Sequence, residues 1–551
     1  MAKYLLRRLF HGILSAIIVT GIVMVLVYSA LDRLLIFATD ANYSKKTNND
    51  KVTYMYETWE KYGYLDYVTY TDYLTELERK GELDTDTKAQ ALAIGKGYPS
   101  GSKSYKNVDY SKETSYVSST DTEIPAQYIR NFVTYYQTKG YTITRLSFIP
   151  SATRASVAEK GGKPVIFAHK DIPVMQRMLT YFGRIFYVDS IYSAKGIDDA
   201  DRKLEFTFHD PAYGGKFSPA IMGYGTNHRY LLYFDNKFPF VHQNLFTIRL
   251  GTSYSINKGQ DVWKTMTSSQ GSFVVKDVLY PSGVTEQSSD DIHSLTYVSD
   301  SYSEINPVIY RRYVDNYTNV GSVKDGRSQM GYSFIIGIIS TLLSYLLGVP
   351  LGIILARKKD KIADKIGAFY IIFIIAVPSL AYIFMFSALG RAMGLPTTFF
   401  TDQQNMAKYG NTIYILPIVS LALPSIAGLM KWIRRYMIDQ MNSDYVKFAR
   451  SGGLSEREIF SKHILKNAII PIVHGIPGAV LVSLVGAIVT ERVYSVPGVG
   501  NVLTKAINAY DNGVIVGVTL FYSLISVISM ILGDILMSIV DPRISFSSSG
   551  R

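Results

Sequence analysis

The sequence predicts a polytopic α-helical membrane protein with six transmembrane helices and a large α+β segment between the first and second. Three observations carry this prediction: six long runs without a charged residue, a long polar stretch after the first run, and an uneven distribution of positive charge. Of the 551 residues, 48% are hydrophobic and 19% charged, and the mean hydropathy is +0.10. A soluble enzyme is excluded, and so is a chain that lies entirely in the membrane.

The six apolar runs set the expected spans. Each is 22 to 29 residues long, and about 20 apolar residues cross a bilayer. The first run follows basic residues, as in a signal peptide, but its 23 residues end without a small-residue cleavage site, so we expect a retained anchor. The expected transmembrane helices are 9–31, 330–356, 366–390, 411–431, 469–491 and 514–540.

Charge sets the expected orientation. The formal net charge is +12, but the polar segment 32–329 is nearly neutral, with 35 Lys+Arg against 34 Asp+Glu. The excess lies in the short segments that alternate with the spans. This is the positive-inside pattern of membrane proteins, and it does not indicate binding of nucleic acid. We therefore expect a multi-pass protein of the cell membrane with 1–8, 432–468 and 541–551 in the cytoplasm and 32–329 as one extracellular domain.

The outward segment shows mixed periodicity and no catalytic pattern. Helical spacing covers 54–80, 126–139 and 171–188, and the last of these could pack on a sheet or lie on the membrane surface. The chain has no cysteine, so neither a disulfide nor a thiolate metal site is possible. In 97–104 the lysine stands two residues after a glycine, which does not fit a phosphate-binding loop. Alternation typical of strands occurs at 141–148, 164–168, 203–208, 245–250 and 272–279.

The segment 443–471 contains the most informative pattern. Two short helices are expected on either side of Gly452 and Gly453, which can adopt the left-handed conformation that ends a helix. Ser455 and Glu458 have the spacing of a capping box that starts the second helix. With the small residue Ala449, this elbow is suited to docking against another surface, although an amphipathic connector lying on anionic lipid has the same composition.

The same residues carry a resemblance to a family. The elbow resembles the loop signature of the first membrane subunit of oligopeptide-type ABC importers, the OppB/DppB class, and the enlarged outward segment is similar to Ami-type permeases of Gram-positive bacteria. Lys431 and Arg434 resemble a pair of basic residues upstream in that family, and the stretch Leu250–Tyr254 resembles its Leu-Gly-x-Ser segment. The matching elbow residues are Asp444, Tyr445, Val446, Ala449, Arg450, Gly453, Leu454, Ser455, His463, Asn467, Ala468 and Pro471, and those downstream are Glu491, Val493, Pro497, Gly498, Gly500 and Asp541–Arg543.

The resemblance implies a type I importer permease fold and a function. The elbow around Ala449 to Glu456 would be the coupling helix that sits in a groove of an ATPase subunit. The chain would bind no cofactor, since ATP and magnesium would be bound by two ABC ATPase subunits. The other implied partners are a second homologous permease, an extracellular peptide-binding lipoprotein, the peptide substrate and membrane lipid. The chain would then be no enzyme but a subunit that moves oligopeptides into the cell by alternating access.

Other residues and other functions stay open at this point. Glu491, Pro497, Gly498, Gly500 and Asp534 are candidates for gating or the pathway. For Asp534, inside the last span, a structural hydrogen bond is favoured over a proton or substrate role. The alternative function is a non-transporting ABC protein that transmits force or a signal through its extracellular domain. A membrane hydrolase is a more distant alternative, because no nucleophile and base have the required spacing.

Overall fold

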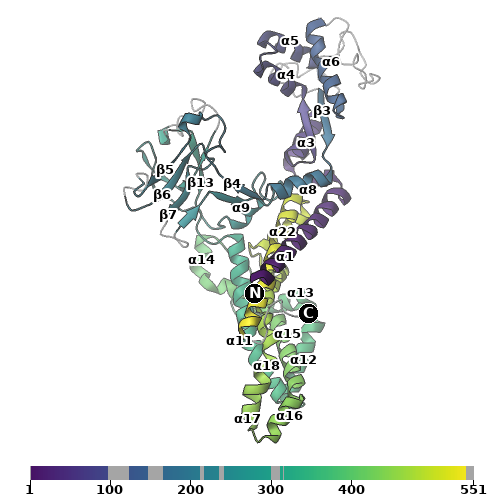
Figure 1. Cartoon of the computed structure of the whole chain (residues 1–551), viewed down its shortest axis with the longest axis vertical. Helices are drawn as coiled ribbons and strands as arrows, with labels where there is room; N and C mark the ends of the chain where they lie inside the picture. The colour runs from purple at the N-terminus through teal and green to yellow at the C-terminus, as the bar shows by residue number, and fades with distance from the viewer. Residues whose placement is uncertain are drawn as a thin grey trace. The chain divides into compact units, whose positions relative to one another are not determined.

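The computed structural model describes residues 2–46, 48–96, 123–146, 166–210, 216–234, 241–298, 311–313 and 315–540. They form two compact units, one of residues 25–183 and one of residues 1–24 together with 184–551. The expected single extracellular domain 32–329 is thus divided, and its second part, 184–328, belongs to the unit that holds the apolar helices (Figure 1). The expected loop 97–104 and the C-terminal stretch 541–551 lie outside the described residues.

The unit of residues 25–183 is an α+β module. Its three antiparallel strands have the order β1-β3-β2, and Tyr70, Leu74, Phe132 and Ile166 are buried in its core. The expected helix 54–80 is wrong in its middle, because Leu65–Thr69 pairs with β3 as a strand. The elements are α2 (Ala41–Lys45), α3 (Asn48–Lys61), β1 (Leu65–Thr69), α4 (Tyr70–Arg79), α5 (Thr85–Lys96), α6 (Glu123–Thr138), β2 (Thr142–Arg145), β3 (Ile166–Asp171) and α8 (Val174–Gly183).

The part 184–328 is built from small antiparallel sheets. A four-stranded sheet of order β5-β6-β7-β8 packs one face on a tyrosine-rich core that includes Tyr230, Tyr280 and Tyr317. The expected helix 171–188 ends at Gly183, and its last residues form β4. The elements are β4 (Phe186–Val188), β5 (Lys203–Thr207), β6 (Ala220–Tyr224), β7 (Tyr230–Phe234), β8 (Val241–Gln243), β9 (Phe246–Ile248), α9 (Val262–Thr267), β10 (Lys276–Leu279), β11 (Thr285–Ser288), β12 (Asp290–Tyr297) and β13 (Tyr317–Ser322).

The other helices of this unit, the apolar spans and the short helices between them, form a bundle (Figure 1). They are α1 (Ala2–Val25), α11 (Gln329–Arg357), α12 (Ile362–Ala376), α13 (Ser379–Ala392), α14 (Gln403–Tyr409), α15 (Ile415–Met441), α16 (Asp444–Ser451), α17 (Glu456–Glu458), the π-helix η8 (Ile459–Leu465), α18 (Lys466–Ala468), α19 (Ile470–His474), α20 (Ile476–Tyr494), α21 (Val499–Asn508) and α22 (Asn512–Val540).

The described residues contain four helices long and apolar enough to cross a membrane: Lys3–Ala30, Gln329–Arg357, Gln403–Met441 and Asn512–Val540. The pair α12 and α13 is bent by 110° and makes a fifth if it counts as one span. Six spans were expected. The difference lies in 469–491, where α19 and α20 are separated at Gly475.

Two glycines let α11 and α15 pack closely along the bundle. A Cβ at Gly348 would lie 2.9 Å from the Cβ of Leu429, and one at Gly352 would lie 2.9 Å from the Cβ of Ile433. Small residues at such crossings allow helix backbones to approach each other in a membrane. At the end of the same pair of helices, Arg434 of α15 donates two hydrogen bonds, of 2.6 and 2.7 Å, to the buried Asp364 of α12.

This packing predicts the effect of a larger side chain. We expect Gly348→Leu to destabilise the chain by about 1–3 kcal/mol, because the added atoms cannot fit against Leu429. The matched control is Gly428→Leu in α15, since no atom lies within 4 Å of a Cβ placed there. Thermal unfolding in detergent checks the difference, and equal midpoints for the two variants would contradict the close packing.

Candidate functional site

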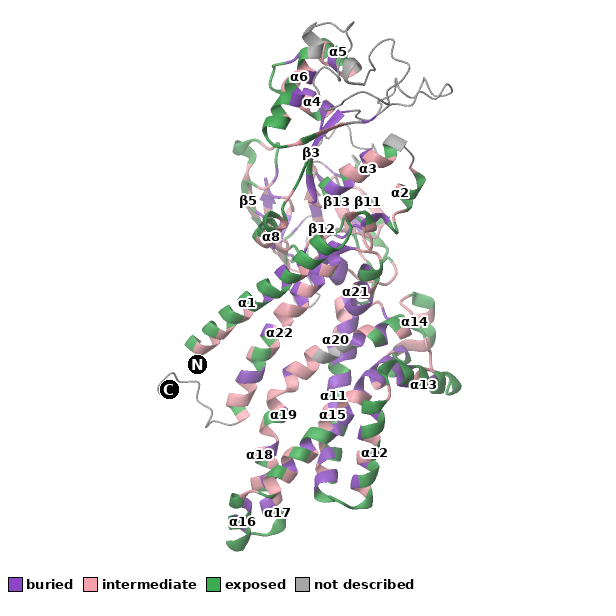
Figure 2. Ribbon diagram, turned by 90° about the vertical axis from the view of Figure 1, so that its right-hand side faces the viewer, coloured by how far each residue is buried: buried purple, intermediate pink, exposed green. Residues whose placement is uncertain are grey.

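The elbow lies at one end of the helix bundle, where Figure 2 shows α16 and α17 next to each other. Gly453 has a φ of +81°, which only glycine adopts at low cost, and no atom lies within 4 Å of a Cβ placed on it. The capping box expected at Ser455 is confirmed: its side chain accepts from the Glu458 amide, and the Glu458 carboxylate accepts from Ser455. The two short helices are therefore joined by a defined turn.

An ion pair closes this turn from outside. Arg450 donates to both carboxylate oxygens of Glu456, at 2.6 and 3.1 Å. The hydrogen bond from Arg450 holds the pKa of the Glu456 carboxyl below its usual range. Because both side chains are exposed, the pair contributes more to the shape of the elbow than to its stability.

Ala449 lies inside the elbow rather than on its surface. Its side chain is buried together with Val446, and both belong to an apolar cluster that includes Ile433 of α15 and Ile472 of α19. The surface is formed by larger side chains, because Phe448 is 80% exposed, and Leu454 and Tyr445 are also exposed. The small residue thus lets the elbow pack on its own helices, and Phe448 is the exposed apolar group.

Sequence reasoning gave no role to Phe448. The available signal was its pattern: an aromatic residue between Lys447 and Ala449 on a short polar helix expected in the cytoplasm. Two further signature residues, Asp444 and Tyr445, make polar contacts within the elbow. Asp444 pairs with Lys447 at 2.9 Å, and the Tyr445 hydroxyl donates to Gln440 Oε1 at 2.6 Å.

A second cluster surrounds the fully buried Glu491 at the other end of α20. Ser333 of α11 donates to Glu491 Oε1 at 2.6 Å, and the Asn501 amide of α21 donates to Oε2 at 2.9 Å. A Cβ at Gly498 would lie 2.3 Å from the Glu491 carboxyl carbon, and one at Gly500 would lie 2.9 Å from Oε2. The structure thus brings three gating candidates together, with the two glycines making room for the carboxylate. Pro497 stands in the turn directly before Gly498.

Asp511 forms a third cluster, which sequence reasoning missed. Its Oδ2 accepts hydrogen bonds from the Ser253 hydroxyl at 2.7 Å and from the amides of Tyr254, Ser255 and Ile256 at 2.9 to 3.2 Å. In return, the Tyr254 hydroxyl accepts from the Asn512 amide at 2.7 Å. This contact ties the stretch Leu250–Tyr254 to the start of α22. Nothing in the sequence pattern around Asp511 indicates its partners in that stretch.

Asp534 joins three helices. Arg8 of α1 lies 2.8 Å from its Oδ2, and His474 of α19 lies 3.5 Å from its Oδ1. The Tyr4 hydroxyl also donates to Oδ2, at 3.2 Å. These contacts are the structural hydrogen bonding that was favoured for Asp534. They place it apart from Glu491, at the opposite end of the bundle.

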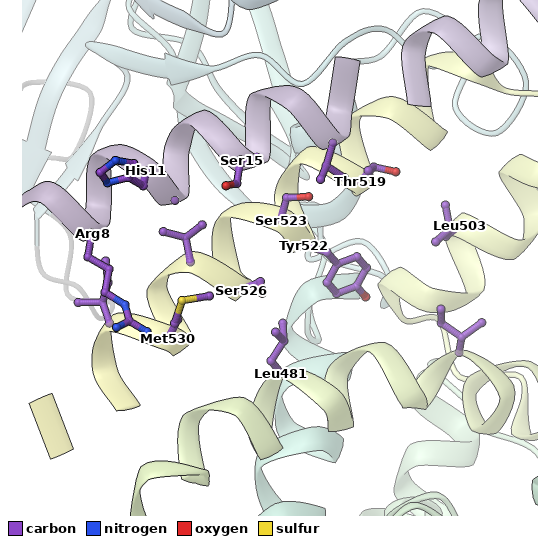
Figure 3. Close-up of a pocket in the computed structure, with 16 residues that line it drawn as sticks. Arg8, His11, Ser15, Leu481, Leu503, Thr519, Tyr522, Ser523, Ser526 and Met530 are labelled. Carbon is purple, nitrogen blue, oxygen red and sulfur yellow. The ribbon is translucent and has the colours of Figure 1, made fainter. Parts of the chain in front are cut away.

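Above Asp534, a cavity of about 580 Å³ opens between α1, α20, α21 and α22. Hydroxyl groups from two helices point toward it, and Figure 3 shows Ser15 of α1 opposite Ser523 and Ser526 of α22, with Tyr522 beside them. Among the described residues there is no group of three His, Asp or Glu side chains that could hold a metal ion. The site as a whole consists of the elbow and of polar contacts that join neighbouring helices. Such an arrangement fits a conformational change better than catalysis.

Comparisons with known proteins agree on one family. The model of the binding-protein-dependent transport system inner membrane component matches residues 348–546. The chain is 32% identical to the oligopeptide transport system permease protein AmiC of Streptococcus pneumoniae over the full length of both. It is also 31% identical to the dipeptide permease DppB of Lactococcus lactis, over 41% of this chain and 73% of that protein, and 29% identical to DppB of Bacillus subtilis, over 40% and 69%.

Among solved structures, an amino acid ABC transporter with histidines matches 39% of this chain and 92% of its own, at 14% identity and a TM-score of 0.30.

The Asp511 cluster gives a second prediction. We expect Asp511→Asn to lower the stability of the joint by about 1–3 kcal/mol, because four donors would lose a charged acceptor. The readout is protease sensitivity of the segment 241–298 in the full-length chain, together with thermal unfolding.

The matched control is Asp402→Asn, which changes the exposed N-cap of α14. The control should leave protease sensitivity unchanged. If Asp511→Asn and Asp402→Asn behave alike, Asp511 does not hold the segment.

Proposed function

Because this chain belongs to the oligopeptide permease family of ABC importers, we propose that its elbow couples an ATPase to a peptide pathway. In this proposal the elbow and the helices joined to it by buried contacts move together as one rigid body. It is a membrane permease subunit, and ATP hydrolysis takes place on partner subunits. The observation that carries the proposal is a set of buried contacts that join the elbow to α11 and α15, α11 to α20, and the segment 250–256 to the start of α22.

The proposal uses six spans. The bent pair α12 and α13 would provide the third, and α19 with α20, from Ile470 to Tyr494, would provide the fifth. The excess of Lys and Arg in the segments 357–365 and 431–466 supports a cytoplasmic elbow. With an even number of spans, both termini are cytoplasmic and the polar parts between α1 and α11 are extracellular.

At the cytoplasmic end, the apolar cluster of the elbow passes a displacement caused by the ATPase on to the helices. Val446 and Ala449 pack with Ala356 of α11 and Met437 of α15, so α16 cannot move without those two helices. Protein interiors are close-packed and resist compression, so a displacement of the elbow is passed on as a shift of whole helices. A groove of an ATPase subunit would take Phe448 and Leu454, the exposed apolar groups of the elbow.

At the outer end, buried carboxylates hold the parts that shape the mouth of the pathway. Glu491 keeps α21 on α11 and α20, and Asp511 keeps the segment 250–256 on α22. Pro497, Gly498 and Gly500 form the turn and the first residues of α21 beside Glu491. Closure of the ATPases would move this assembly relative to a second permease, which opens the pathway to one side at a time.

The implied partners follow the family. We propose a second homologous permease, two ABC ATPase subunits that bind ATP and magnesium, and an extracellular peptide-binding lipoprotein that delivers oligopeptides. The location would be the cell membrane of a Gram-positive bacterium, in line with the Streptococcus relative. Similarity over the full length to a transport permease favours this function over a force-transmitting protein that does not transport.

The elbow provides the test. We expect Gly453→Trp to reduce peptide uptake at least about tenfold, the effect of losing some 1.4 kcal/mol of coupling, because a bulky side chain would stand where the ATPase docks. Gly453→Asn is the control, since asparagine tolerates a positive φ and adds little bulk. Uptake and ATP hydrolysis are measured together in vesicles that contain the whole importer.

The two readouts separate uncoupling from misfolding. Uncoupling leaves hydrolysis in place while uptake is lost, whereas a misfolded chain does not assemble with the ATPases. Peptide uptake at the original rate by Gly453→Trp would show that the elbow is not the docking site.

A further inference from the structure

The two strands β4 and β9 form a short ribbon with two different faces. They pair antiparallel, with Phe186 opposite Ile248 and Val188 opposite Phe246. Paired residues lie on the same face of a sheet, so these four apolar side chains share one face. Phe186 is 65% exposed, Val188 58% and Phe246 42%, and the two phenylalanine rings stack at 5.5 Å.

The opposite face of the ribbon is fixed to the rest of the unit. Tyr187 points to this side and accepts a hydrogen bond from the Asn227 side chain, and the Arg249 guanidinium lies 3.8 Å from the centre of its ring. Directly after β4, the buried Asp189 accepts from the amides of Asn227 and His228 at 2.8 Å. The exposed apolar face is therefore held in place and cannot turn inward.

The ribbon lies next to the outer turns of α22. β9 leads through Arg249 into Leu250, and a Cβ at Gly517 would lie 2.4 Å from the Leu250 carbonyl oxygen. Two residues later, the Thr252 carbonyl oxygen would lie still closer, at 2.1 Å, to a Cβ placed on Gly513. Figure 1 shows β4 and α9 beside this end of α22.

The length of α22 relates this level to the bilayer. Its 29 residues span about 43 Å at 1.5 Å per residue, whereas the hydrocarbon core is about 30 Å thick. A helix along the bilayer normal would therefore extend beyond the core by roughly 13 Å in total, or about nine residues. Gly513 and Gly517 lie within the first six residues of α22, so their contacts stand at the very end of this span. This position fits a ribbon at the boundary between headgroups and hydrocarbon.

Basic residues at one end of the ribbon suit this boundary. Arg184 precedes β4, Arg249 follows β9, and both are exposed. The two positions adjoin, since the Arg249 amide donates to the Ile185 carbonyl at 2.8 Å. The Arg249 guanidinium stacks on Tyr187 of the opposite face, so Arg184 is the basic residue nearest the apolar face. An apolar face with an arginine at its end matches a surface of acyl chains and phosphate headgroups, where basic residues near anionic lipid are favourable.

We propose that the apolar face of the β4–β9 ribbon, formed by Phe186, Val188, Phe246 and Ile248, binds the lipid surface at the outer boundary of the bilayer. The ribbon would then fix the height of the segment 184–328 above the membrane, next to the joint at Asp511. The outer side of the membrane rests on the orientation proposed above, whereas burial of the ribbon in lipid is measured independently of transport.

The chain has no cysteine, so a single introduced thiol can be labelled cleanly. We would place a nitroxide at Phe186→Cys, and separately at Phe246→Cys, in the full-length chain assembled with its importer. The assembly would be held in nanodiscs of phosphatidylglycerol and phosphatidylethanolamine. Oxygen is concentrated in lipid and a water-soluble nickel chelate is excluded from it, so the ratio of the two accessibilities reports depth.

We expect a high ratio of oxygen to nickel accessibility at both ribbon positions. The matched control is Phe206→Cys on β5, an aromatic residue that is 58% exposed and belongs to the separate four-stranded sheet. It should show the low ratio of a label in water.

Two results would overturn the proposal. High nickel accessibility at Phe186 and Phe246 would place the ribbon in water. Low accessibility to both reagents would show that a protein partner, such as the second permease, covers it. Because no uptake is measured, these outcomes do not depend on whether the elbow couples to an ATPase.

Discussion

A carboxylate buried in or beside a membrane must have its oxygens satisfied by other parts of the protein, and this constraint determines how the unit of apolar helices is held together. Four buried carboxylates each stand where separate elements meet. Asp364 joins α12 to α15, Glu491 joins α20 to α11 and α21, Asp511 joins the segment 250–256 to α22, and Asp534 joins α22 to α1 and α19. Apolar packing alone could slide, whereas these contacts fix one register for each pair.

These joints explain how a short elbow could act at a distance. The apolar cluster beneath α16 packs on the ends of α11 and α15 that lie next to the elbow, and Ser333 of α11 binds Glu491 near the other end of that helix. From there α21 leads to Asp511 and the segment it holds. Removing the partner of one of these carboxylates would leave an unpaired charge in a buried site. The free energy lost would exceed the stabilisation that the paired interaction itself contributes. The series therefore favours movement of whole helices over local bending.

The sequence predicted those features that depend on local pattern. The capping box at Ser455 is confirmed because its two partners are three residues apart, and Asp534 faces the bundle interior, as expected of a carboxylate inside an apolar span. Features set by distant partners were missed or wrong. Leu65–Thr69 reads as part of a helix, but it becomes a strand because β3, about 100 residues later, pairs with it. Asp511 gives no local signal of this joint, since the partners of its Oδ2 lie more than 250 residues earlier.

The most direct test of rigid-body movement is to measure one distance within the chain during the transport cycle. Ser451 in the elbow and Gln260, four residues after the segment 250–256, are both exposed and can carry spin labels. Pulsed EPR can then compare the nucleotide-free importer with one trapped with ATP. The account predicts the same distance distribution in both states, while the distance from Ser451 to a label on the second permease changes. A distance between Ser451 and Gln260 that changes with ATP would contradict it, because the elbow and the outer segment would then move separately.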